Sequence, residues 1–80
     1  MSPTVVRARG MRLHFYASEE SRVHVHAIRE GREAKFWLEP IIELSHNDGM
    51  TRRELSVALE LVREHEQEIR AAWQAFFGNR

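Results

Sequence analysis

The residues best suited to chemistry are histidines that share one side of a predicted strand. His24 and His26 are separated by a single valine. Alternate residues of a strand point to the same face, so the two imidazoles lie about 7 Å apart. His14 belongs to an earlier alternating segment and joins them if the two segments are neighbours. Histidine is the side chain that most often takes and gives protons at neutral pH, so this cluster suits acid–base chemistry.

In a first interpretation the cluster cleaves RNA. One imidazole of His24 and His26 takes the 2′-hydroxyl proton and the other protonates the leaving oxygen. Lys35 and Arg12 stabilise the negative charge that develops on the phosphate. Unpaired bases stack on aromatic side chains, and ribose and phosphate groups accept hydrogen bonds. Three further residues of the same face are therefore expected to contact RNA: His14, Tyr16 and Trp37.

Two other interpretations of the histidines stay open. In one, His14, His24 and His26 form a three-imidazole metal site. The His-x-His spacing is a weak signal, and no carboxylate with ligand spacing accompanies it, so we predict neither a metal nor another cofactor. In the other, the histidines are solvated strand residues or the polar rim of a protein interface. The chain has no phosphate-binding glycine motif and no serine in a nucleophile-elbow context.

The elements that position these residues are two predicted β-hairpins. Apolar and polar residues alternate with the period of half-buried strands. The predicted strands flank Arg9-Gly10 and Glu30-Gly31, where glycine can adopt the positive φ of a tight turn, and they span residues 4–8, 11–16, 23–29 and 32–38. The polar segment 17–22 is the predicted loop between the hairpins. If Glu30-Gly31 is a two-residue turn, His26 pairs with Lys35 and His24 with Trp37.

Beyond the hairpins, a short fifth strand and a long helix are predicted. Residues 41–44 form the strand, and 46–49 form a turn. Thr51 and Glu54 make a capping box at the start of a helix that runs to about residue 77. An apolar stripe follows the helical period: Leu55, Ala58, Leu59, Val62, Ile69, Ala72, Trp73 and Phe76. The alternative is a break near Glu64 to Glu66.

The C-terminal aromatics are the predicted partner-binding surface. A continuous helix of this length would extend past the sheet, carrying Trp73, Phe76 and Phe77 with it. Contiguous exposed aromatic residues usually mark association surfaces, here for a second copy or a partner protein. The alternative is that these residues complete the core.

Length and composition predict one α+β domain over residues 1–80, with a four- to five-stranded antiparallel sheet about 4–45 and the helix packed on one face. The 80 residues are 42% hydrophobic and 30% charged, which is ordinary for a folded chain. There is no cysteine, and the formal net charge is zero. No apolar run approaches the ~20 residues that cross a bilayer. We therefore expect a cytoplasmic protein without a membrane partner.

Several segments resemble the family called domain of unknown function 4160. They are the start Pro3 to Val6, the strand Arg12 to Tyr16, the segment Val23 to His26, the segment Glu33 to Pro40, and the ending Ala72-Trp73 with Phe76-Phe77-Gly78. The resemblance covers nearly the whole chain. Family members commonly carry prolines before the histidine pair, where this chain has Ser21-Arg22-Val23.

What the resemblance implies is a small prokaryotic protein encoded beside another small domain. Such pairs resemble type II toxin–antitoxin modules, and this family resembles the toxin half. Combined with the histidine face, this predicts a toxin that acts as an endoribonuclease, with RNA and a cognate antitoxin-like small protein as partners, and a homodimer as a further association. The alternative is a non-enzymatic interaction module, an antitoxin or a regulator, that uses the same face and the C-terminal aromatics for binding.

Overall fold

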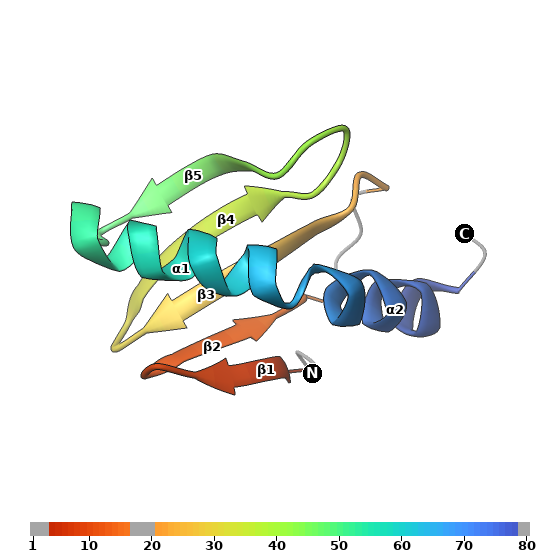
Figure 1. The fold of residues 1–80 in the computed structure, drawn as a ribbon, viewed down its shortest axis with the longest axis horizontal. Helices are drawn as coiled ribbons and strands as arrows, with labels where there is room; N and C mark the ends of the chain where they lie inside the picture. The colour runs from red at the N-terminus through yellow and green to blue at the C-terminus, as the bar shows by residue number, and fades with distance from the viewer. Residues whose placement is uncertain (1–3, 17–20, 79–80) are drawn as a thin grey trace.

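Five strands are followed by two helices in a computed structural model that describes residues 4–16 and 21–78 (Figure 1). The predicted α+β class is confirmed. The strands form one antiparallel sheet in sequence order: β1 (Thr4–Ala8), β2 (Met11–His14), β3 (His24–Arg29), β4 (Arg32–Trp37) and β5 (Glu43–Asp48). The helices are α1 (Arg52–Glu64) and α2 (Glu66–Phe77). Residues 17–20 of the predicted loop lie outside the described residues.

The two predicted tight turns are confirmed. Arg9 and Gly10 have φ of 52° and 75°, and Glu30 and Gly31 have φ of 48° and 82°. Two successive positive φ values are those of a type I′ turn, whose twist matches that of the flanking strands. The turn at Glu30-Gly31 sets the register of β3 on β4, so that Arg29 pairs with Arg32, His26 with Lys35 and His24 with Trp37, as predicted.

Gly31 allows a test of what this turn requires. A Cβ at Gly31 would meet no atom within 4 Å, so Gly31→Ala should destabilise only through the left-handed backbone. We expect the free energy of unfolding in urea to fall by roughly 1–2 kcal/mol. Glu30→Asn is the matched control and should not destabilise, because asparagine tolerates this conformation. A neutral Gly31→Ala variant would contradict the turn geometry.

The apolar side of the sheet faces the helices: α1 crosses in front of the strands in Figure 1, and α2 continues past their end. Alternation along the strands sends Leu13, Val25, Ala27 and Phe36 to this side, and each is at most 2% exposed. The helices add to the same core from the other side. Their buried residues are Ala58, Leu61, Val62, Ile69, Trp73 and Phe77. The polar residues between them in the strands therefore occupy the sheet face opposite the helices.

The structure shows two helices with a break between them, as in the alternative prediction, rather than one continuous helix. The capping box of Thr51 and Glu54 is present as predicted. His65 separates α1 from α2 with φ −109° and ψ 20°. The residues around it, Arg63 to Glu68, are polar, so no core contact holds a straight axis here. α2 lies beside the end of the sheet where β2 finishes and β3 begins (Figure 1).

The fifth strand also differs from the prediction. β5 spans Glu43–Asp48 and includes residues whose types predict a turn. The turn itself is shorter: Gly49 has a φ of 95°, and the Asn47 side chain both accepts from the backbone N–H of Met50 and donates to its carbonyl. β2 is shorter than predicted and ends at His14, so Tyr16 follows the strand rather than belonging to it.

Candidate functional site

A row of four basic side chains crosses the polar face of the sheet. His14 pairs with His26, His26 with Lys35, and Lys35 with His46 on β5. Directly paired residues on one face lie within reach of each other. The register therefore brings His14, His26 and Lys35 together as expected, and adds His46, which the sequence pattern assigns to a turn.

The imidazoles of His14 and His24 are buried rather than solvated. Their residues are 1% and 3% exposed. The ring of His24 contacts Trp37 and Trp73, with centroids 5.7 and 5.0 Å away. The ring of His14 lies 4.7 Å from Tyr16 and 5.6 Å from His26. These two histidines therefore pack as aromatic residues, while His26, with 12% of its side chain exposed, remains the most accessible of the three.

Glu33 on β4 connects the surrounding polar groups. The Tyr16 hydroxyl donates to the Glu33 carboxylate, with both oxygens 3.0 Å away. Nδ1 of His26 lies 2.8 Å from Oε2 of Glu33, without the alignment of an ideal hydrogen bond. Because a carboxylate oxygen repels a nitrogen lone pair, this contact favours the tautomer with hydrogen on Nδ1. Nε2 is then the nitrogen of His26 that can accept a proton.

The protein environment holds His26 and His14 in the neutral form. Burial lowers the pKa of His26 to about 4; the charge of Glu33 opposes this shift, and the neighbouring His24 and His14 add to it. The pKa of His14 is also lowered, first by burial and then by the charge of Arg12. Burial raises the pKa of Tyr16, and its hydrogen bond to Glu33 raises it further. His26 is consequently a proton acceptor rather than a proton donor at neutral pH.

A pocket of about 350 Å³ opens beside His26. We call it the histidine pocket, and its lining residues are His26, Glu33, Lys35, Ser45, His46 and Asp48. The β4–β5 register shifts between Lys35 and Phe36. This bulge is an extra residue on β5, and bulges of this kind redirect side chains. It explains why neighbouring Ser45 and His46 both line the pocket.

Trp37 lies on the polar face of β4, two residues after Lys35, and pairs with His24. The Arg22 guanidinium is 4.1 Å from the Trp37 ring centroid, and the Lys35 ammonium is 4.3 Å from it. Both distances are within the range of cation–π contacts. Trp37 therefore holds two cations next to the histidine pocket, in addition to presenting an aromatic surface.

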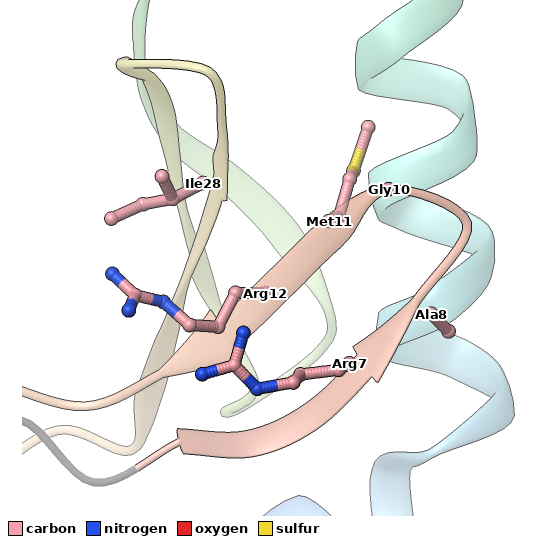
Figure 2. A pocket seen from close by; sticks show the side chains of 6 residues that line it. All are labelled: Arg7, Ala8, Gly10, Met11, Arg12 and Ile28. Atoms are coloured by element: carbon pink, nitrogen blue, oxygen red, sulfur yellow. The ribbon is translucent and has the colours of Figure 1, made fainter.

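Arg12 and Lys35 line different pockets. Arg12 lines a second pocket, of about 480 Å³, together with Arg7, Ala8, Gly10, Met11 and Ile28 (Figure 2). In the sheet, Arg12 pairs with Ile28, and Ile28 pairs with Glu33. β3 therefore lies between Arg12 and Glu33, and Arg12 is not among the residues that line the histidine pocket with His26 and Lys35.

The three C-terminal aromatics differ in exposure. Trp73 and Phe77 are 8% and 7% exposed and belong to the core, whereas Phe76 is 43% exposed. Trp73 contacts Phe15 edge-to-face, with ring centroids 5.3 Å apart. Phe76 lies further from Phe15, at 6.4 Å. Trp73 and Phe77 thus complete the core at the end of the sheet, and Phe76 is the one of the three that is open to a partner.

Metal-ligand groups and membrane-spanning helices were the remaining features to compare with the sequence expectations. Within residues 4–16 and 21–78, no group of three or more histidine, aspartate and glutamate side chains is arranged to hold a metal ion. No helix in the described part of the chain is both long enough and apolar enough to cross a membrane.

The family model described as "Domain of unknown function (DUF4160)" matches residues 10–74. This match includes β2 to β5, α1 and most of α2. No curated protein and no solved structure matches the chain.

Proposed function

This chain belongs to the DUF4160 family, and we propose that it is the toxin component of a type II toxin–antitoxin pair, acting as an endoribonuclease at the histidine pocket. The observation that carries the proposal is the 2.8 Å contact between Glu33 and Nδ1 of His26, in a pocket shared with Lys35 and His46. A carboxylate that orients an imidazole, beside a second imidazole and an ammonium, is the set of groups that phosphodiester cleavage requires.

In the proposed reaction His26 is the general base. Its Nε2 takes the proton of a ribose 2′-hydroxyl, and the 2′-oxygen forms a bond to the adjacent phosphorus. The bond from phosphorus to the 5′-oxygen breaks, and His46 gives a proton to that oxygen. Lys35 stabilises the negative charge on the phosphate oxygens in the transition state. The products are a 2′,3′-cyclic phosphate and a 5′-hydroxyl.

Burial assigns a different part to the remaining predicted residues. His24 is enclosed by Trp37 and Trp73 and fixes the position of His26, whose ring centroid is 5.2 Å away. Tyr16 holds Glu33 through its hydroxyl. Neither His24 nor Tyr16 transfers a proton in this scheme. His14 supports His26 from the other side, and Trp37 is available to the RNA.

Exposed apolar side chains support the antitoxin partner. Within the described residues the large exposed ones are Ile41 at 64%, Leu44 at 44% and Phe76 at 43%. Ile41 lies just before β5 and Leu44 lies within it, and β5 is an edge strand of the sheet. An edge strand with exposed apolar residues can pair with a partner chain. A small antitoxin bound along β5 would cover the Ser45–Asp48 side of the histidine pocket. Such a pair would act in the cytoplasm, where its RNA substrate is found.

The proposal is tested by RNA cleavage in the presence of EDTA. Wild-type protein should cut a single-stranded oligoribonucleotide and leave a 2′,3′-cyclic phosphate. Removing the general base in His26→Gln should lower the rate constant by 10²- to 10⁴-fold. Because the pKa of His26 is about 4, activity should persist at pH 5, where a free imidazole would be protonated. An acid limb near pH 6.5 would show that another group is the base.

The matched control is His65→Gln, which removes an imidazole at the helix break, where it contacts Glu68. It should cleave RNA like the wild type. In a bacterial host the wild type and His65→Gln should arrest growth, and His26→Gln should not, with all three folded by circular dichroism. A folded wild type that never slows growth and copurifies with a toxic neighbour would instead identify the non-enzymatic alternative.

A further inference from the structure

Two arginines face each other across the β1–β2 hairpin. Arg7 on β1 pairs directly with Arg12 on β2. Figure 2 shows both side chains extending to the same side of the hairpin, with the Arg12 guanidinium further out, below Ile28. Like charges directly opposite in a sheet repel each other and destabilise the pair. The arrangement therefore needs an anion to be favourable.

No carboxylate of the described residues supplies that anion. In residues 4–16 and 21–78, neither Arg7 nor Arg12 forms an ion pair, whereas Arg9, Arg29 and Arg32 each have a glutamate oxygen within 3.3 Å. Nε of Arg12 is buried, and it too has no hydrogen-bond partner in the described part of the chain. A buried donor without a partner is costly, and the described residues do not satisfy this nitrogen of the Arg12 guanidinium.

An apolar side chain beside the two arginines strengthens their preference for an anion. The other lining residues of their pocket are Ala8, Gly10, Met11 and Ile28. Of these, Ile28 has its side chain on the side of the two guanidiniums, above them in Figure 2, whereas the side chains of Met11 and Ala8 point away from them. An apolar neighbour reduces the screening of charge, so an anion beside Ile28 is attracted more strongly than it would be in bulk water. A guanidinium presents a planar fork of donors that matches two oxygens of a phosphate.

We infer that Arg7 and Arg12 together hold a backbone phosphate of the RNA that flanks the cleaved bond. The inference rests on the proposed function and deepens it. Arg12 lies on the same sheet face as Glu33, with β3 between them. Two strand spacings put the backbones of Arg12 and Glu33 about 10 Å apart. Arg12 is therefore a substrate-binding residue rather than a group that stabilises charge at the reacting phosphorus.

The test measures RNA binding without cleavage. In the His26→Gln background, a fluorescein-labelled single-stranded oligoribonucleotide is titrated at several KCl concentrations. Adding Arg7→Gln and Arg12→Gln should weaken binding at least tenfold at low salt. The slope of log K against log [KCl] should become shallower by about 0.7 for each phosphate that the variant no longer neutralises. The thermal midpoint should not fall, since the substitution removes repulsion.

Arg52→Gln with Arg53→Gln is the matched control, because it removes the same charge from the start of α1. It should change the affinity less than twofold. Equal weakening in the two double variants would reduce the effect to net charge and overturn the inference, as would unchanged affinity in the Arg7–Arg12 variant or no RNA binding by the parent. Binding that depends on Arg7 and Arg12 in a protein that cuts no RNA would sustain the phosphate site and refute the nuclease. If the protein cleaves RNA but its RNA affinity does not depend on Arg7 and Arg12, the nuclease is sustained and the phosphate site is refuted.

Discussion

Trp73→Ala should lower the free energy of unfolding by about 3–5 kcal/mol, as expected for removing a large aromatic side chain from a core. The Trp73 ring has centroid distances of 5.3 Å to Phe15, 5.0 Å to His24 and 4.2 Å to Phe77. These contacts join α2, the segment after β2 and the start of β3. Removing the indole would leave a cavity at the end of the sheet and free α2 from it. Urea unfolding followed by circular dichroism measures the effect.

Phe76→Ala is the control for this prediction. Phe76 is 43% exposed, against 8% for Trp73, so its truncation should cost about 1 kcal/mol or less. The two variants separate the roles that the sequence pattern groups together. If Phe76→Ala destabilised as strongly as Trp73→Ala, the assignment of Phe76 to an open surface would be wrong. If Trp73→Ala were neutral, α2 would not be held by the core.

The hairpins were predictable because two independent signals agree there. A two-residue turn containing glycine fixes the register, and strict alternation fixes the faces. The pairings of His26 with Lys35 and of His24 with Trp37 follow from these signals alone. The start of α1 was predictable for the same kind of reason: Thr51 and Glu54 satisfy backbone N–H groups locally, whatever the rest of the fold does.

The features that sequence patterns missed depend on tertiary contacts. His46 and Asp48 resemble turn residues, but β4 has an edge that β5 must pair with, and this extends β5 to Asp48. The bulge at Ser45 interrupts the alternation of β5, and all of its residues are exposed, so no period-two apolar pattern marks the strand. The burial of His14 and His24 has no local signal, because His26 and Trp73, which pack against them, lie far away in the sequence. The break at His65 has no glycine or proline to mark it.

Acid should destabilise this protein in a window set by His26. An unfolded histidine has a pKa of about 6.5, and in the folded chain the pKa of His26 is about 4. Above pH 6.5 neither state binds this proton, and the stability is complete. Between pH 6.5 and 4 only the unfolded chain binds it, so stability falls as the pH falls. Below pH 4 both states are protonated, and the decline stops. The lowered pKa of His14 acts in the same direction.

The expected decrease from His26 between pH 7 and pH 4.5 is about 2 kcal/mol, below the ~1.4 kcal/mol per pKa unit of the full shift because the side chain keeps some contact with water. Urea unfolding at a series of pH values measures it. His26→Phe keeps a ring against Tyr16 and His24 but cannot titrate, so its stability should change less with pH. His46→Gln, which replaces an exposed residue of β5 and leaves His26 in place, is the control and should keep the acid sensitivity that His26 causes.

The result also bears on the proposed chemistry. If His26→Phe is destabilised in acid as much as the wild type, His26 is not held neutral by burial. The same neutrality makes His26 the base in the proposed reaction. The burial by Tyr16, His14 and His24 that makes the fold sensitive to acid therefore also keeps a proton-free nitrogen beside Lys35 at pH values where an exposed histidine would already carry charge.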